Sequence, residues 1–265
     1  MLAFAQQRPL VTEDPETVGE GLVLVEFGAD VTKGVEFPAS GLEGNFARFP
    51  LYGVSVGIGS RAEIQFDGGL YNRLSITDRR AAPLSSVVET SGDVTSSIED
   101  MVIGAKVRLV TETPGRPALG FRFATRLPNA SNESGIGLDT FDFYASALVA
   151  KTIQSVRLVG NVGMGILADP TRGDRQNDVL TYGVSLARAL TEAVEVVAEI
   201  NGRESVREGT PPPGTESRGT IRFGGRYTIG AWRADAALLI GVTSQDGSVG
   251  LAGGATYVFD WFQAP

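Results

Sequence analysis

Charged side chains recur at alternate positions along much of this chain, and they are the residues whose type and spacing could do chemistry. The 265 residues include no histidine and no cysteine. The chain therefore cannot build a Ser-His-Asp triad, a thiolate nucleophile or a metal site with His or Cys ligands. We expect no enzyme activity, no cofactor and no metal. The charged residues are instead expected to sort or bind other charged groups.

These charges alternate with apolar residues, which is the period of a β-strand. In one segment Glu195 and Glu199 alternate with Val194, Val196 and Ala198. We predict that the charged faces of all such segments line one shared interior. The predicted lumen-lining residues are Glu26, Glu63, Asp67, Lys106, Arg108, Arg122, Arg126, Glu195, Glu199, Arg222, Arg226 and Arg233.

The alternating segments number about twelve, an even number, as single-chain outer-membrane barrels require. The expected strands are 21–31, 49–59, 61–74, 98–111, 117–127, 140–151, 155–167, 179–188, 194–204, 218–229, 231–243 and 248–260. Long polar connections, at 32–48, 75–97, 128–139, 168–178 and 205–217, alternate with short ones. Outer-membrane barrels have long outer loops, short periplasmic turns and both termini in the periplasm. The pattern predicts an all-β fold, a closed antiparallel transmembrane β-barrel in up-and-down order, in the outer membrane of a Gram-negative-type bacterium.

Two other structures are weaker explanations of the same pattern. The segment 189–200 has apolar residues at helical spacing, but it also keeps strict alternation from Val194 onward. A soluble β-sandwich has strands of about five or six residues, roughly half the length of these segments. The longest apolar run, 236–242, is far shorter than the roughly 18 residues that a membrane-spanning helix needs.

The facing rule of a membrane barrel predicts which side chains meet lipid. A charge at mid-depth on the lipid face costs about 2–4 kcal/mol, so the uncharged face points outward. Val196 should face lipid and Val197 the lumen. A symmetric hairpin would place Glu199 opposite Arg222 and Glu195 opposite Arg226, which are stabilising cross-strand pairs.

The same hairpin rule places Arg108 opposite Arg122, which is unfavourable unless an acid or an anion lies between them. Two hypotheses remain open for this charged interior. It could be a constriction that filters solutes by charge, as charged rings do in pores. It could equally be a salt-bridge network that fills a narrow barrel, because twelve strands lie between the filled eight-stranded and the open sixteen-stranded barrels.

The N-terminus and the net charge limit the partners. Ala3 and Ala5 occupy the small-residue positions that precede a signal cleavage site. We therefore expect residues 1–18 to be a signal remnant and a periplasmic N-terminal segment, and residues 19–265 to form the barrel. The formal charge of −8 and the pI of about 4.8 argue against a nucleic-acid partner.

Several stretches resemble the outer-membrane protein family of the meta-pathway of phenol degradation. They are Arg8–Gly21, the stretch 100–106, Ala118–Pro128 with its terminal Arg-Leu-Pro, and the strand that begins near Tyr182-Gly183. The resemblance implies an outer-membrane barrel that passes small solutes, among them aromatic or other hydrophobic compounds. The alternative function is a closed structural or adhesion barrel whose extracellular loops mediate interaction.

The C-terminal segment 254–259 is similar to the assembly signal of outer-membrane barrels, a Gly followed by alternating aromatic residues such as Tyr257 and Phe259. The expected partners are therefore outer-membrane lipid, the barrel assembly machinery and a small-molecule solute whose identity the sequence does not give.

Overall fold

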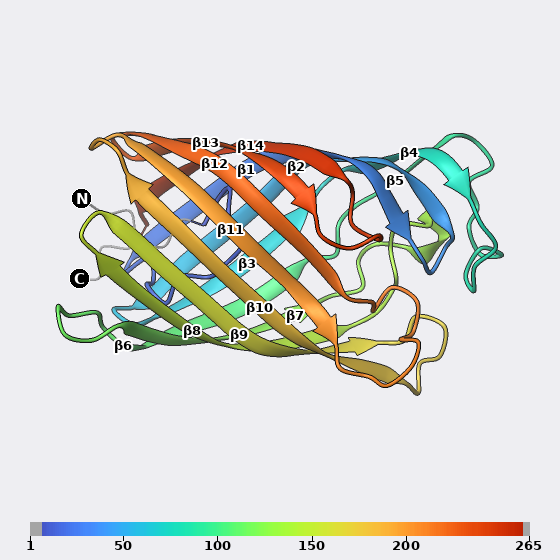
Figure 1. The fold of residues 1–265 in the computed structure, drawn as a ribbon, viewed down its shortest axis with the longest axis horizontal. Coiled ribbons are helices and arrows are strands. Elements are labelled where there is room, and N and C mark those ends of the chain that lie inside the picture. Colours follow the sequence, from blue (N-terminus) through green and yellow to red (C-terminus); the bar gives the residue numbers. More distant parts are fainter. Residues whose placement is uncertain (1–6, 262–265) are drawn as a thin grey trace.

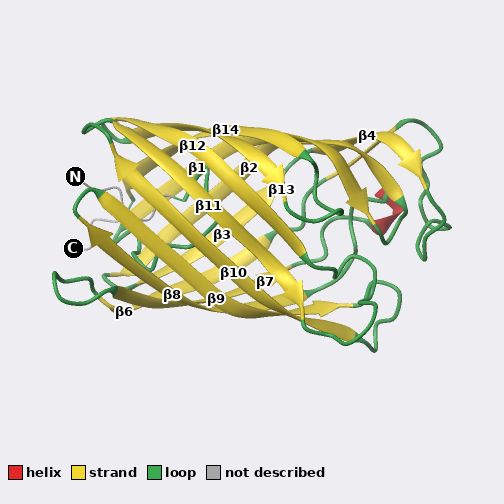
Figure 2. Ribbon diagram, viewed as in Figure 1, coloured by secondary structure: helices red, strands yellow, loops and turns green. Residues whose placement is uncertain are grey.

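One antiparallel sheet contains all the strands of residues 7–261, the part of the chain that the computed structural model describes (Figures 1 and 2). Its strands are β1 Leu22–Phe37, β2 Leu42–Gly59, β3 Ala62–Gly69, β4 Asn72–Arg79, β5 Val94–Ser97, β6 Val102–Val110, β7 Ala118–Arg126, β8 Asp142–Ile153, β9 Val156–Ala168, β10 Gln176–Ala189, β11 Val194–Ser205, β12 Arg218–Ile229, β13 Trp232–Gly241 and β14 Val249–Asp260. A single 3-10 turn, η1 Asn132–Ser134, interrupts an outer loop. The sheet closes on itself because β1 pairs with both β2 and β14. Within residues 7–261 no helix is long and apolar enough to cross a membrane.

The fourteen segments make a barrel of twelve strands, since β3 with β4 and β5 with β6 are interrupted strands. The inner half of β2 pairs with β3 and its outer half pairs with β4. The change occurs at Pro50, which has no N–H to donate to a ladder. Phe49 N donates to Tyr71 O at 2.8 Å and Leu70 N donates to Pro50 O at 3.0 Å across the break. Neighbouring strands follow chain order, so the predicted closed up-and-down barrel is confirmed.

The chain ends and the short turns lie at one end of the barrel and the longer connections at the other, as Figure 1 shows. One predicted loop is wrong. The range 32–48 is mostly strand, because β1 runs to Phe37 and β2 begins at Leu42, leaving residues 38–41 as a turn. This hairpin extends with β4 and β5 beyond the rest of the barrel, and Phe37 and Phe46 pack with ring centroids 5.4 Å apart. The Gly and Pro residues that suggested a loop occupy a bulge and the turn.

The second predicted outer loop, 75–97, is also shorter than expected. Strand β4 continues to Arg79 and β5 starts at Val94, so the irregular part is 80–93. Strand pairing continues beyond the barrel wall because β4 pairs with β2 on one side and with β5 on the other.

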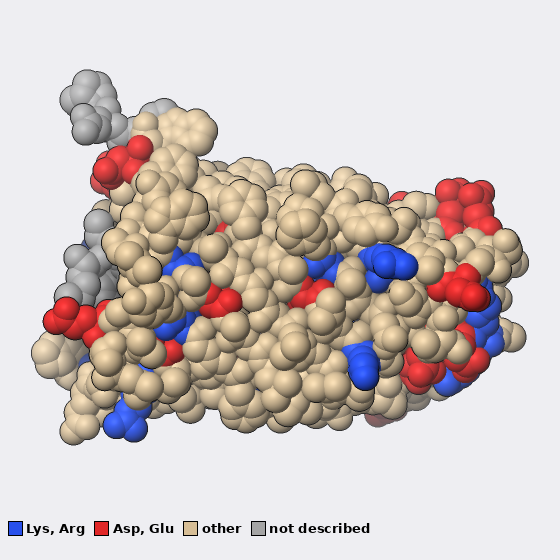
Figure 3. Space-filling model, turned by 90° about the horizontal axis from the view of Figure 1, so that it is seen from above, with Lys and Arg blue, Asp and Glu red and all other residues tan. Residues whose placement is uncertain are grey.

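A belt of apolar side chains covers the outside of the barrel wall. Its exposed members include Phe27, Val31, Val107, Leu109, Leu119, Phe123, Phe143, Val149, Leu158, Val162, Met164, Leu180, Val184, Leu186, Val196, Ile200, Phe223, Leu238 and Leu251. In the face that Figure 3 shows, uncharged atoms cover most of the wall, and the acidic groups gather mainly at its two ends. Val196 is 40% exposed on the outer face of the wall, and Val197 is 4% exposed on the inner face, which confirms the predicted facing.

A closed barrel with an apolar exterior satisfies every wall N–H and C=O internally, the requirement for crossing a bilayer with strands. Aromatic rings stack at the end that carries the termini: Trp232 with Tyr257 at 4.5 Å, and Tyr257 with Phe259 at 5.8 Å between centroids. Such rings mark the membrane–water interface. The chain is a bacterial outer-membrane β-barrel, as the sequence predicts.

Candidate functional site

Residues 7–18, which we call the plug segment, lie inside the barrel at the end that carries the termini (Figure 1). Leu10 is 6% exposed and packs against Ala187 and Val197 of the inner wall. Val18 packs against Leu24. The segment has no strand or helix of its own. Residues 7–18 were expected in the periplasm, and the structure places them in the lumen. The expected signal remnant at residues 1–6 lies outside the described residues.

Wall side chains satisfy the backbone of the plug segment. Val11 N and Thr12 N donate to the Glu199 carboxylate at 2.9 and 2.5 Å. Glu13 N donates to Asn161 Oδ1 at 2.6 Å, and Asn161 Nδ2 donates back to Glu13 O at 2.7 Å. Buried backbone amides need such partners, and here side chains take the place of a sheet ladder. The wall is therefore matched to a peptide in this position.

The same match extends to the end of the plug segment, where Val18 N donates to Glu63 Oε2 at 2.7 Å. Glu63 itself is 1% exposed and contacts Lys106 Nζ at 3.0 Å. One buried carboxylate thus accepts from the plug backbone and neutralises a buried cation of the wall, which removes the cost of leaving either unpaired.

Three carboxylates of the plug segment contact cations of the wall. Glu13 lies 2.9 Å from Arg122 Nε and 3.3 Å from Lys106 Nζ. Asp14 accepts from Arg157 Nη2 at 2.6 Å. In addition, Glu16 pairs with Arg108. These are charge-assisted contacts between mostly enclosed groups, the stronger class of protein hydrogen bond.

At its other end the plug segment presents a cation to acidic groups. The Arg8 guanidinium donates to Gly253 O at 2.8 Å and lies 3.5 Å from Asp235. Its backbone N–H donates to Glu26 at 3.3 Å, and Arg226 donates to the Arg8 carbonyl at 2.8 Å. Each charged part of the plug segment therefore lies against wall groups of opposite charge: Arg8 against acids, and the acidic residues 13–16 against cations.

Inward-facing glycines leave room for this segment. A Cβ atom added at Gly57 would lie 1.7 Å from Gly19 O, and one added at Gly28 would lie 2.1 Å from the Arg8 guanidinium. A Cβ at Gly183 would lie 2.7 Å from Thr12 Oγ1. Any larger residue at these strand positions would collide with the segment or with its continuation into β1. The mid-strand glycines are thus binding surface for the chain's own N-terminus.

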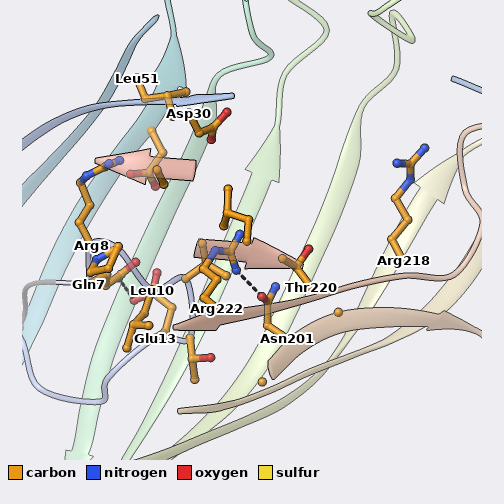
Figure 4. Close-up of a pocket in the computed structure, with 18 of the residues that line it drawn as sticks. Gln7, Arg8, Leu10, Glu13, Asp30, Leu51, Asn201, Arg218, Thr220 and Arg222 are labelled. Atoms are coloured by element: carbon orange, nitrogen blue, oxygen red, sulfur yellow. Dashed lines mark hydrogen bonds between the residues drawn. The ribbon is translucent and has the colours of Figure 1, made fainter. Parts of the chain in front are cut away.

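A cavity of about 700 Å³ lies between the plug segment and the outer loops and is lined by residues from all twelve strands. Figure 4 shows some of these residues. Gln7, Arg8, Leu10 and Glu13 form part of its floor. The lining continues through Arg222 and Arg218 of β12 to Asp246 and Gly247 of the last outer loop. The lining mixes charged groups with apolar ones: Asp30, Arg48, Asp67, Arg122, Arg126, Arg218 and Arg222 with Val35, Phe46, Leu51, Val102 and Leu239. Twelve strands thus leave space that eight would fill.

The outer loop 127–141 is tied to three other outer segments. Ser40 Oγ of the β1–β2 turn donates to Gly135 O at 2.6 Å, and Thr95 Oγ1 of β5 donates to Ser134 O at 2.7 Å. Leu138 lies within 2.8 Å of the position that a Cβ of Gly214 would take. This loop therefore links the long outer hairpin to the connection between β11 and β12.

Two of the predicted cross-strand pairs are confirmed and a third is wrong. Glu199 is in register with Arg222 and contacts it at 2.7 Å, and Glu195 is in register with Arg226 and contacts it at 2.8 Å. Arg122 faces Lys106, because the turn closes with Thr113 opposite Arg116 and a bulge between Arg108 and Val110 shifts the β6–β7 register by one more residue. The acid that contacts both of these cations is Glu13 of the plug segment.

The other predicted lumen residues have partners of several kinds. Glu26 accepts from Thr256 Oγ1 at 3.1 Å, and Asp67 lies 3.7 Å from Arg122. Arg126 lies 3.3 Å from Asp100 and also contacts Asp142, whereas Arg233 is buried and donates to Thr228 Oγ1 at 3.3 Å. That these residues meet a passing solute stays a prediction.

Glu112 lies in the turn between β6 and β7 and contacts Arg157, the arginine that holds Asp14 of the plug segment. Glu112 lies 3.0 Å from Arg157 and 3.3 Å from Lys151, and it accepts from Thr152 N at 2.7 Å. Burial raises the pKa of Glu112, but the Thr152 amide and the two cations lower it more, so the pKa lies below its usual 4.5. This carboxylate stays ionised in mildly acidic conditions.

Sequence reasoning missed Glu13, Asp14, Glu16 and the wall residues Gln65 and Asn161 that hold the plug segment. Two signals were present. The acidic run Glu13-Asp14-Pro15-Glu16 carries charges that complement the basic strands. The mid-strand glycines also indicate close approach of another backbone.

No family model matches the chain, and no curated protein matches it in sequence. Many solved structures are similar to it in fold. The translocator domain of autotransporter NalP from Neisseria meningitidis is 12% identical with a TM-score of 0.49, over 89% of this chain and 87% of that one. The Pseudomonas putida toluene transporter TodX is 10% identical with a TM-score of 0.46, over 94% and 92%. Salmonella typhi OmpF, solved with daunomycin, is 8% identical with a TM-score of 0.41, over 91% and 98%. At these values the likenesses carry no argument about function, and the resemblance to the meta-pathway family stays a prediction.

Proposed function

We propose that this barrel lets small solutes cross the outer membrane and that the plug segment closes its periplasmic end at rest. The observation that supports passage is the cavity of about 700 Å³, which reaches from the outer loop at Asp246 to the plug segment. A barrel with a purely structural role needs no such space, and side chains can fill a narrower one. Under this proposal the plug segment is the last barrier before the periplasm.

The way in which the plug segment is held is compatible with release. It contributes no strand to the barrel wall, whose twelve strands pair without it. Its contacts are mainly side-chain hydrogen bonds and ion pairs, which water and mobile ions can replace in a wet lumen. Release would therefore leave the wall intact.

The resemblance stated above implies aromatic or other hydrophobic solutes, and the cavity lining allows a more specific proposal. Apolar side chains such as Phe46 and Leu239 lie among the arginines Arg48, Arg122 and Arg222. A solute that carries both an apolar body and a charged or polar group fits this lining better than a pure hydrocarbon does, because a hydrocarbon would displace water from these charged groups without replacing its hydrogen bonds.

A reversible disulfide tests this function. Thr12 Cβ lies 3.4 Å from the position that a Cβ of Gly183 would take, close to the separation of about 3.5–4.5 Å in disulfides. The chain has no other cysteine, so Thr12→Cys with Gly183→Cys gives one defined cross-link. In planar bilayers the oxidised protein should carry no current, and reduction should open conducting events.

The matched controls are the two single-cysteine variants, whose currents should not respond to oxidant or reductant. Equal currents from the oxidised and reduced double variant would reject the plug as the barrier. If neither wild type nor any variant conducts at any voltage, passage is wrong. The closed structural or adhesion barrel would then stand, a reading that the tied outer loop at Gly135 favours.

A further inference from the structure

Four wall cations surround the acidic part of the plug segment. Lys106 and Arg108 lie on β6, Arg122 on β7 and Arg157 on β9. We call these four residues the basic cluster. Lys106 is fully buried, and the side chains of Arg108, Arg122 and Arg157 are only 19, 17 and 15% exposed. They have therefore lost most of their water, and each relies on nearby acids.

The plug segment supplies much of that neutralisation. The wall itself offers Glu63 to Lys106 at 3.0 Å, Asp67 to Arg122 at 3.7 Å and Glu112 to Arg157 at 3.0 Å. These three wall acids face four cations.

Arg108 stands apart within the basic cluster. Within residues 7–261 its acidic contact is Glu16 of the plug segment, and its other hydrogen bond goes to Ser60 O at 2.6 Å. Departure of the plug segment removes Glu13, Asp14 and Glu16 together, which leaves the four cations of the basic cluster with the three wall acids. Such a site favours an anion that can take the vacated positions.

On the opposite side of the lumen the plug segment presents a cation to wall acids. There the plug cation Arg8 lies against Glu26 and Asp235. Asp235 is 8% exposed, and neither of its carboxylate oxygens has a hydrogen-bond partner within the described residues. Arg226 and Arg233 lie on this side as well, so its charges stay mixed when Arg8 leaves, whereas the basic cluster loses three acids together.

We propose that the basic cluster is a binding site for the carboxylate groups of passing solutes, and that Glu13, Asp14 and Glu16 occupy it at rest. This inference rests on the proposed function and names its solute class as small carboxylates. Arginine and lysine at these distances already hold carboxylates in the closed state, and guanidinium groups recognise that group with two parallel hydrogen bonds. A solute that enters from the cavity competes with the plug segment for the same four cations, so binding and opening are coupled.

Equilibrium binding tests the site without requiring conduction. The full chain with Glu13→Gln, Asp14→Asn and Glu16→Gln keeps the length of the plug segment and removes its negative charges. Calorimetric titration of the refolded protein with succinate should show binding at least about tenfold tighter than to wild type, the effect of one charge-assisted hydrogen bond. The neutral diamide succinamide should not bind, and phosphate should bind more weakly.

Two variants in this triple background locate the site. Adding Arg108→Gln and Arg122→Gln should abolish succinate binding, whereas Arg218→Gln, at the outer end of the cavity, should not. Adding Thr12→Cys and Gly183→Cys should make binding depend on reduction, since the oxidised form holds the plug segment in place. Retention of the heat-dependent gel shift of folded barrels shows that each variant folds.

No succinate binding to a folded triple variant, equal binding of succinamide or phosphate, or binding that survives loss of both arginines would overturn the carboxylate site. The outcome is independent of conduction. A barrel that never conducts but binds succinate through Arg108 and Arg122 would contradict passage and leave the site standing.

Discussion

The facing of the barrel wall makes a quantitative prediction at Ile200. Ile200 is the seventh of the twelve residues of β11, is 41% exposed and lies in register with Val184 and Ile221. Strands in such barrels are tilted by roughly 40° and rise about 3.3 Å per residue, so four residues span about 10 Å of depth. At the periplasmic end, Val196 is in register with the outward-facing Arg188, which places that level near the interface. Ile200 therefore lies close to mid-depth.

Ile200→Arg should lower the free energy of unfolding by about 2–4 kcal/mol, the cost of a charge on the lipid face at mid-depth. Val196→Arg, about 10 Å nearer the periplasm, should cost roughly 0–1 kcal/mol. Ala252→Arg is the inward control, because Ala252 lines the cavity opposite Asp30. Denaturant titrations in lipid vesicles measure all three. Equal losses at Ile200 and Ala252 would refute the assigned facing, and equal losses at Ile200 and Val196 would refute the depth. Val197 is unsuitable as the control, since it packs against Leu10.

Three other predictions concern the plug, the periplasmic turn and the outer loops. Gly57→Ala should loosen the plug segment and increase conductance, because its Cβ would lie 1.7 Å from a backbone oxygen, whereas Gly59→Ala, with nothing within 4 Å, should match wild type in the same bilayer recording. Glu112→Gln should reduce stability above pH 4.5; because the folded pKa is lowered, the difference from wild type should vanish as the pH falls through that lower value in a pH series of denaturant titrations. Cysteines at Ser91 and Ser131, both exposed in outer loops, should label with an impermeant maleimide in intact cells, and labelling only after the outer membrane is broken would reverse the orientation.

The barrel could be predicted because its constraints are local and repeated. Alternation in segments such as 194–204 gives both the strand and its lipid face, and the pairs Glu199–Arg222 and Glu195–Arg226 follow from one symmetric hairpin. Prediction failed where a local irregularity shifts the register. The position of the turn at Thr113–Arg116 and the bulge after Arg108 together move Arg122 opposite Lys106, and no periodicity shows a bulge in advance.

Loop lengths failed for a related reason. Composition near Pro38 and Gly41 marks a turn, but it does not say how far the flanking strands continue. That length depends on partners distant in the sequence, here β4 and β5, which pair with the outer half of β2 and with each other. The length of a loop predicted from its polar residues is therefore an upper limit on the length of the irregular segment.

The site could not be predicted because it depends on one segment meeting many distant ones. The like charges at Lys106, Arg108 and Arg122 are unfavourable in an isolated hairpin, and sequence reasoning could say only that an acid or an anion must lie between them. The structure supplies Glu13 and Glu16 from a segment more than 90 positions away. With the plug segment in place these cations belong to a salt-bridge network. Under the proposed function, displacement of the plug segment would turn the same cations into a constriction, so the filled network and the charged constriction would be two states of one lumen. The charge that we propose selects solutes is therefore the charge that holds the plug segment in place.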